Sequence, residues 1–390
     1  MIATALGIAL FGWSYAVAAT SVYGAGRAAW SRARRAPARV EASTRVLVVR
    51  PCAGLEPELD RTLMSLSGAL TGATLACRFA VHGPSDPAAM PAARAAAALR
   101  AKGVDASLVF TAADAPNHKV AQIEAVLARE RASSDVLVVA DSDVDLTGFE
   151  LDALVAPLLA DATVGAVWAP PIEAGAASGS GDRASRALLA GSLHAFTLLG
   201  ALDGGGLVGK LFAVTSDAVG AVGGFGGMTR VLGEDMELAR RLRAAGRSVR
   251  VAPVVARSLQ TGRSWKSAVE RYARWLTVVR AQRPHLLASY PLLFFATPLV
   301  VLASLALLPF SPALALASLG LALASRLLVA ATARAFAGER FSPRASLIDV
   351  VLADALLVAA FARALASRKF TWRGRTLTVD RRGALSEETA

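Results

Sequence analysis

The stretch Asp135–Asp143 (DVLVVADSD) decides the fold class, because five apolar residues run directly into two aspartates. A short β-branched run of this kind, bounded by polar residues, is typical of a buried strand. Open α/β sheets bind ligands beyond the carboxyl ends of their strands, where Asp141 and Asp143 would lie. Two carboxylates there offer hard oxygen ligands for Mg²⁺ or Mn²⁺. Acidic pairs after strands also simply cap turns, so the pair alone leaves both interpretations open.

Similar β-branched runs alternate with longer Ala-rich stretches from about residue 45 to residue 255. This alternation predicts strands joined by crossover helices, and therefore an α/β fold with a mostly parallel sheet and helices on both faces. Besides the run before Asp141, the predicted strands are 45–50 (RVLVVR), 78–82 (RFAVH), 107–110 (SLVF) and 165–169 (GAVWA). Crossover helices are predicted at 55–69 and 120–131, and a Gly-, Ala- and Ser-rich loop at 173–182.

Apolar segments flank this region, and the chain as a whole is 54% hydrophobic and only 18% charged. Residues 2–22 carry no charged side chain and are long enough to cross a hydrocarbon layer of about 30 Å as a helix. We predict an uncleaved transmembrane anchor over 1–24 rather than a cleaved signal peptide, because no basic residue precedes the apolar run. The stretches 285–308 and 313–331, separated by a PFSP turn, predict a transmembrane hairpin within 285–333.

A third apolar stretch, 345–366, contains Asp349 and Asp354 and precedes a basic tail over 367–390. Arginines near membrane segments mark the cytoplasmic side, and the arginines between residues 27 and 39 follow the first segment directly. We therefore expect the domain 45–284 and the tail to face the cytoplasm. A third full span would export the tail, so an interfacial or re-entrant helix is favoured over a transmembrane one.

The net charge of +12 also fits an anionic membrane surface. The sequence contains neither zinc-finger spacing nor an aromatic RNA-binding signature, so nucleic acid is not the expected partner.

Glu234 and Asp235 (GEDME) lie at the start of a predicted helix, 236–245. Acidic residues at this position commonly cap the helix and complement its dipole. The alternative is a general base, a carboxylate that takes the proton from an attacking hydroxyl group.

Arg271 and Arg274 stand three residues apart in the segment RYARW, which ends at Trp275. On a helix they share one face, where paired guanidinium groups suit a diphosphate. Trp275 could pack against an acceptor or the bilayer edge. A basic amphipathic helix beside the membrane is the alternative.

The order of these three motifs resembles glycosyltransferase family 2. Within that superfamily the chain most resembles the ceramide glucosyltransferases of family 21 and related bacterial lipid glycosyltransferases. Three more segments carry the resemblance: 50–58 (RPCAGLEPE), 117–119 (NHK) and 372–375 (WRGR).

The resemblance implies a GT-A fold, a UDP-sugar donor, Mg²⁺ or Mn²⁺, and an inverting single displacement. Asp143 and Asp141 would bind the metal and the donor, with Lys119, Arg271, Arg274 and Trp275 as further donor contacts. Asp235 would be the base and Glu234 would support it or the acceptor. The first aspartate of the family aligns near Gly83, and the nearest carboxylate, Asp86, is the candidate to replace it in donor binding.

The expected function is the transfer of a hexose, glucose or a relative, from a UDP-sugar to a membrane lipid, with a ceramide-type acceptor favoured. A hopanoid or polyprenyl phosphate acceptor is the alternative. The altered position near Gly83 also leaves open a catalytically inactive membrane scaffold. A single anchor before the catalytic domain disfavours a processive polysaccharide synthase. The expected location is integral to a membrane such as a bacterial inner membrane, with the lipid bilayer itself as a partner.

Overall fold

The computed structural model describes residues 1–34, 39–112, 114–130, 134–372, 375–380 and 383–387. The chain forms two compact units. We call Met1–Arg34, Ala177–Leu202 and Gly262–Phe370 the helical unit. We call Arg35–Ala176, Asp203–Thr261 and Thr371–Ala390 the sheet unit.

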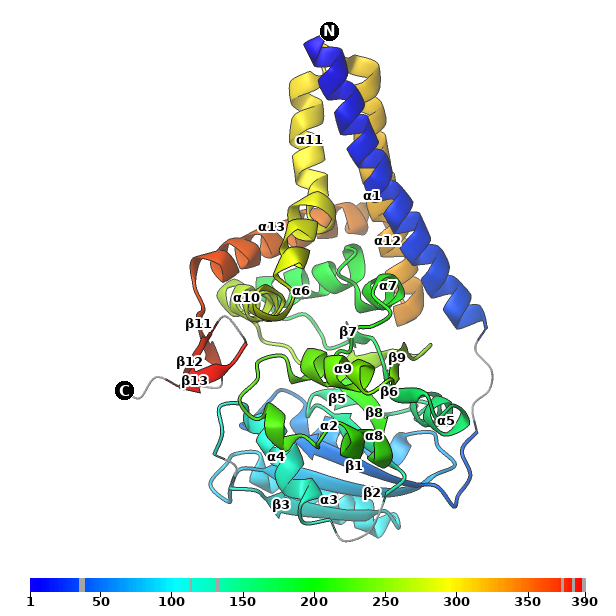
Figure 1. Ribbon diagram of the computed structural model, residues 1–390, viewed down its shortest axis with the longest axis vertical. Coiled ribbons are helices and arrows are strands. Elements are labelled where there is room, and N and C mark those ends of the chain that lie inside the picture. Colours follow the sequence, from blue (N-terminus) through cyan, green and yellow to red (C-terminus); the bar gives the residue numbers. More distant parts are fainter. Residues whose placement is uncertain (35–38, 113, 131–133, 373–374, 381–382, 388–390) are drawn as a thin grey trace. The chain divides into compact units, whose positions relative to one another are not determined.

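The sheet unit is built on a seven-stranded sheet of order β3-β2-β1-β4-β8-β6-β9 (Figure 1). All neighbouring strands are parallel except β8, which runs antiparallel to both β4 and β6. Because β1 lies between β2 and β4, the strand order reverses there, and open α/β sheets bind ligands beyond the carboxyl ends of the strands at such a point. The strands are β1 (Arg45–Pro51), β2 (Thr74–Val81), β3 (Asp105–Phe110), β4 (Val136–Ala140), β6 (Val164–Trp168), β8 (Leu211–Thr215) and β9 (Ser248–Val251).

Apolar side chains on both faces of the sheet explain why helices cover both. On one face Val46 and Val48 of β1 pack with buried residues of α2 (Leu59–Met64), α3 (Ala89–Ala101) and α5 (Asp152–Ala160). On the other face α4 (His118–Leu127) packs on β1 and β2. The predicted α/β class, with a mostly parallel sheet and helices on both faces, is thus confirmed.

From Thr371 onward the C-terminal tail belongs to the sheet unit. Strands β12 (Arg375–Val379) and β13 (Leu385–Glu387) pair antiparallel, in a small sheet that also contains β11 (Lys369–Trp372). The Leu385 N–H donates to the Arg230 carbonyl at 2.7 Å. The tail is therefore folded against the segment that leads into the Glu234–Asp235 motif.

In the helical unit α1 (Ile2–Ala33), α11 (Ala296–Leu307) and α12 (Pro312–Ala337) pack side by side (Figure 1). Four other helices of this unit are α6 (Ser180–Gly191), α7 (Phe196–Leu202), α10 (Trp265–Gln282) and α13 (Pro343–Ala366). Helix α13 packs on α6 and α10 and runs across the direction of α1 and α12 (Figure 1).

Among the described residues four helices are long and apolar enough to cross a membrane: α1, Ser180–Leu202, α12 and α13. A fifth candidate is Pro284–Phe294 with Ala296–Leu307, which is bent by 49°. These long apolar helices are typical of membrane association. The segment Ser180–Leu202 was not predicted, and 72% of its apolar window is buried inside the structure, against 22% for α1.

Several predicted boundaries were wrong for local reasons. The stretch 285–308 is broken, because a π-helical turn at Tyr290–Phe294 contains Pro291, whose ring cannot continue a regular helix. The predicted helix 55–69 is a short helix followed by a 3₁₀ turn, Ser65–Gly68. The predicted loop 173–182 is shorter, since β7 (Pro171–Glu173) ends at Glu173 and α6 begins at Ser180.

Candidate functional site

The loop that carries Asp141 and Asp143 follows β4 at the reversal point of the sheet. Arg50, whose side chain is fully buried, donates to the carbonyls of Asp141 at 2.9 Å and Val144 at 2.7 Å. Ser142 Oγ donates to Glu56 Oε2 at 2.6 Å. A guanidinium group has several N–H donors in a fixed planar arrangement, so it can bind several backbone carbonyls of the loop at once and fix their positions.

Lys210 lies between the two aspartates of this loop, and the sequence analysis missed it. Because β8 pairs antiparallel to β4, with Ala140 opposite Leu211, the next pair brings Lys210 opposite Asp141. Lys210 Nζ lies 2.5 Å from Asp143 Oδ2 and 3.4 Å from Asp141 Oδ2. The only signal in the sequence was a lysine directly before the apolar run 211–214.

Lys119 lies at the start of α4, which Asn117 caps by accepting the Val120 N–H. Its Nζ lies 2.9 Å from Asp141 Oδ1 and 3.3 Å from Glu234 Oε1, and it donates to the Gly209 carbonyl at 2.6 Å. Burial alone would lower the pKa of Lys119, but the carboxylates of Asp141 and Glu234 outweigh burial and raise it. The ammonium is therefore charged at neutral pH.

Asp235 lies in the first turn of α9 (Glu234–Ala244), which follows Gly233 in the left-handed region at φ 74°. The Gly209 N–H donates to Asp235 Oδ2 at 2.8 Å, and the Met236 N–H donates to Oδ1 at 2.8 Å. Burial and the neighbouring charge of Glu234 raise the pKa of Asp235 to about 6, against the opposing effect of Lys119. Such a carboxyl group is ionised at neutral pH and is a stronger base than an ordinary aspartate.

The structure thus joins five predicted residues in one connected cluster of the sheet unit. Asn117 Nδ2 also donates to Glu234 Oε2 at 3.1 Å, so Glu234 is held from two sides. We call the set the acidic cluster, and with Lys210 it consists of Lys119, Asp141, Asp143, Lys210, Glu234 and Asp235.

Asp86 has a structural task of its own. Its Oδ1 accepts the N–H groups of Gly54 at 2.8 Å and Ala88 at 2.9 Å, so it fastens the loop after β2 to the loop after β1. A Cβ atom at Gly83 would meet nothing within 4 Å. Donor binding by Asp86 stays a prediction.

Arg271, Arg274 and Trp275 lie on α10 in the helical unit. The Arg271 guanidinium lies 4.9 Å from the centre of the Trp275 ring, a cation–π distance. The Trp275 ring stacks on His194 with centroids 6.3 Å apart, and Phe196 approaches it edge-on at 5.4 Å. Trp275 is therefore packed among aromatic rings, and the contact of these residues with a donor stays a prediction.

The donor set of Asp141 and Asp143 fits a divalent cation only in part. No group of three or more His, Cys, Asp or Glu side chains suited to a metal occurs among the described residues. Mg²⁺ commonly binds through one or two carboxylates and takes its other ligands from substrate phosphates and water. The two aspartates fit a cation that arrives with a diphosphate.

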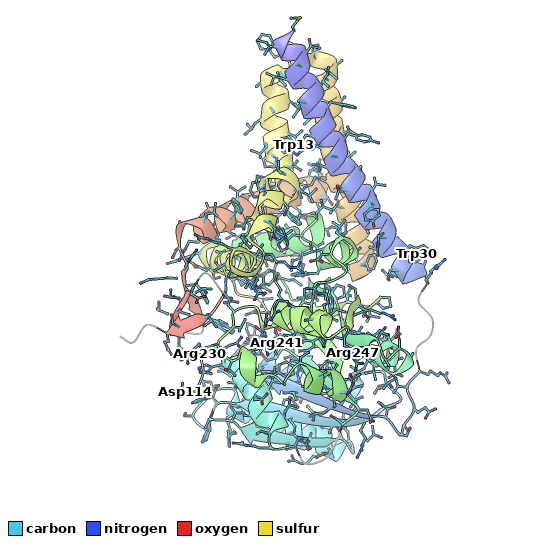
Figure 2. All side chains as sticks on the ribbon, viewed as in Figure 1. Trp13, Trp30, Asp114, Arg230, Arg241 and Arg247 are labelled. Atoms are coloured by element: carbon cyan, nitrogen blue, oxygen red, sulfur yellow. The ribbon has the colours of Figure 1, made fainter. Side chains whose placement is uncertain are left out.

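A cavity of about 420 Å³ lies in the sheet unit, between the segments that lead into α4 and α9 and the folded tail. Asp114 and Arg230, which line it, are labelled in Figure 2. Arg375 and Glu387 form an ion pair in its wall, and Arg375 Nη1 also donates to the Ala115 carbonyl at 3.4 Å.

An α/β sheet with paired aspartates at its reversal point, a carboxylate of raised pKa at a helix start and long apolar helices fit a membrane-associated glycosyltransferase. The chain belongs to glycosyltransferase family 21, because residues 10–385 match the sequence model of "Glycosyl transferase family 21". A comparison with proteins of curated description gave no match.

Two solved structures are similar to this chain at low identity. A mannosyltransferase from Pyrobaculum calidifontis, in complex with GDP-Man and Mn²⁺, is 17% identical with a TM-score of 0.47, over 93% of this chain and 99% of that one. Glucosyl-3-phosphoglycerate synthase from Mycobacterium tuberculosis, with Mn²⁺, UDP and phosphoglyceric acid, is 17% identical with a TM-score of 0.38, over 63% of this chain and 84% of that one.

Proposed function

We propose that this protein transfers a hexose, glucose or a relative, from a UDP-sugar to the hydroxyl group of a membrane lipid of ceramide type. The observation that carries the proposal is the acidic cluster. It joins a paired aspartate loop, two half-buried lysines and a carboxylate of raised pKa at the reversal point of the sheet. Family 21 membership supports a glycosyl transfer, and the long apolar helices support a lipid acceptor.

Asp235 is the proposed general base. The acceptor oxygen attacks the anomeric carbon of the sugar while its proton passes to an Asp235 carboxylate oxygen and the bond to the diphosphate breaks. The Gly209 and Met236 N–H groups fix the orientation of this carboxylate. One displacement of this kind inverts the anomeric centre.

Asp141 and Asp143 are the proposed holders of a Mg²⁺ or Mn²⁺ ion, which would neutralise the leaving diphosphate. Lys119 adds a fixed positive charge beside Asp141. Arg271 and Arg274 are proposed to bind the diphosphate, and Trp275 to shape the donor or acceptor contact.

Two features of the helical unit support attachment to a bilayer with the arginines on the cytoplasmic side. Near the end of α1, Arg34 lies 4.2 Å from the ring centre of Trp30, an aromatic residue suited to a membrane interface. Beyond the first turn of α13, where Arg344 is exposed, the exposed large side chains of this helix are apolar, which suits a helix lying in the interface. They are Leu347, Ile348, Val351, Val358 and Leu365.

A hopanoid or polyprenyl phosphate acceptor is the second candidate within the same chemistry, and an inactive scaffold is the candidate outside it. The direct test incubates the purified full-length protein in nanodiscs with UDP-glucose, UDP-galactose or GDP-mannose and Mg²⁺ or Mn²⁺. Each donor is combined with ceramide, diacylglycerol, a hopanoid alcohol or polyprenyl phosphate, and lipid products are identified by mass spectrometry.

We expect a glycosylated ceramide from a UDP-hexose, and loss of that product in Asp235→Asn. The matched control is Asp217→Asn, because Asp217 is also the second residue of a helix, α8 (Ser216–Ala221), but its side chain is 77% exposed. If the only glycosylated product forms on another of these lipids, that lipid would be the acceptor instead of ceramide. Absence of both transfer and donor hydrolysis in every combination would establish the scaffold.

A further inference from the structure

The two aspartates proposed to hold a divalent cation already have a positive charge between them. Lys210 Nζ donates to Asp143 Oδ1 at 2.6 Å and to Asp143 Oδ2 at 2.5 Å, and it lies 3.4 Å from Asp141 Oδ2. Within the described part of the chain, the ammonium has no other charged or hydrogen-bonding partner.

Asp143 is enclosed in this arrangement. Its residue is 2% exposed, and Oδ2 also accepts a hydrogen bond from Ser258 Oγ at 2.6 Å. Both carboxylate oxygens are thus in use, and a metal ion that ligates Asp143 must take the place of the Lys210 ammonium. The two cations cannot remain together, because their repulsion acts across a few ångströms in a poorly solvated site.

Lys119, the other lysine of the acidic cluster, is held more firmly. It donates to the Gly209 carbonyl at 2.6 Å and contacts carboxylates on two different elements, Asp141 and Glu234. The backbone of Lys210 is fixed to the Asp141 N–H at 2.9 Å, whereas its side chain end is bound only to the two aspartates. Lys210 can therefore leave the aspartates by side-chain rotation, with its backbone still in place.

We propose that Lys210 is the resident counter-ion of Asp141 and Asp143, and that a divalent cation binds there only together with a nucleoside diphosphate that draws the ammonium onto its phosphates. The exchange keeps the aspartates neutralised in the free protein and supplies one more positive charge to the diphosphate in the complex. It makes Lys210 a donor-binding residue that couples metal binding to donor binding. This inference rests on the proposed function, since it takes the donor to be a nucleotide sugar.

The test measures Mn²⁺ binding to the full-length protein in nanodiscs, without any sugar donor, from the electron paramagnetic resonance signal of free Mn²⁺. Lys210→Met removes the charge and keeps most of the side-chain length. We expect it to tighten Mn²⁺ binding by at least about thirtyfold, because the metal must separate the wild-type ammonium from two carboxylates, and each ion pair about 4 Å apart contributes about five- to sixfold even in bulk water. Lys102→Met is the matched control, because the Lys102 ammonium is exposed and bonds to Ser67, and it should leave Mn²⁺ binding unchanged.

A second measurement adds UDP. In the wild type UDP should tighten Mn²⁺ binding at least tenfold, and in Lys210→Met this gain should be clearly smaller, because no ammonium has to be displaced. Unchanged or weaker Mn²⁺ binding in a folded Lys210→Met variant would overturn the inference. If the Lys210→Met variant does not fold, the wild type decides. Equal Mn²⁺ affinity of the wild type with and without UDP overturns the inference. A tenfold gain in Mn²⁺ affinity on adding UDP, with the same gain in Lys102→Met, supports it.

The two proposals fail separately. A wild type that transfers sugar while Lys210→Met binds Mn²⁺ no better refutes the counter-ion alone. A wild type that transfers no sugar from any donor refutes the proposed function, and the comparison of Mn²⁺ affinities is unaffected by that result.

Discussion

The ionisation of Asp235 should set the acid side of the pH profile of sugar transfer. Burial contributes most to its raised pKa and Glu234 contributes next, while Lys119 and the N–H groups of Gly209 and Met236 oppose them. The result is a pKa of about 6 instead of 3.8. A general base must be deprotonated to act, so activity should be lost as the pH falls through about 6.

The expected size of the loss follows from this value. With a pKa of about 6, about nine-tenths of Asp235 is ionised at pH 7 and about a tenth at pH 5, so kcat/KM should fall about tenfold between them. An aspartate at 3.8 would still be about nine-tenths ionised at pH 5. The assay is transfer of radiolabelled sugar to lipid in nanodiscs at low donor concentration, because kcat/KM reports the ionisation of the free enzyme.

Two variants separate this base from other groups. Glu234→Gln removes a negative neighbour, so it should lower the pKa of Asp235 and move the acid limb to lower pH. Asp235→Asn should lower kcat by about 10² to 10⁴. Asp217→Asn should change neither kcat nor the position of the acid limb, because the exposed carboxyl group of Asp217 pairs with Arg247 away from the acidic cluster. A wild-type kcat/KM that stays constant from pH 7 to pH 5 would refute the assignment. An acid limb that lies at higher pH in Glu234→Gln than in the wild type would refute it as well.

Three further outcomes are expected. Asp143→Asn, which keeps the side-chain volume, should lower transfer by at least about 10²-fold in protein that still unfolds in a cooperative thermal transition, whereas activity that survives both this change and exhaustive chelation would contradict the metal role. Cysteines placed at Ser31 and Thr376, which are both exposed, should react with an impermeant thiol reagent only from the cytoplasmic side. The background should be low because the two native cysteines are buried. Labelling at position 376 from outside would show that α13 spans the membrane. Arg326 donates to Asp354 at 2.6 Å in a buried pair, so Arg326→Met should cost about 3–5 kcal/mol of stability in thermal or denaturant unfolding. Adding Asp354→Leu to that variant should recover most of the loss. An Arg326→Met variant as stable as the wild type would contradict this expectation.

Local pattern in the sequence was enough for much of the fold. The run 136–140 is apolar throughout because β4 is buried on both faces, and that pattern is a property of adjacent residues. Adjacent residues were also sufficient to predict the first strand, α1 and the start of α9 beside Gly233. The order of the motifs along the chain was also sufficient to indicate family 21, which the match over residues 10–385 confirms.

What only the tertiary structure decided depends on residues that are far apart in sequence. The antiparallel insertion of β8 beside β4 brings Lys210 to Asp143, 67 positions away, and no local pattern encodes that register. Arg50 reads as a strand-end arginine, yet it is fully buried under a loop about 90 residues further on, because its donors match that loop's carbonyls. Pattern along the chain thus determined which residues are strands, helices and candidate acids. Strand pairing determined which charges share a site, because electrostatic and hydrogen-bond energies depend on distance in space and not on distance along the chain.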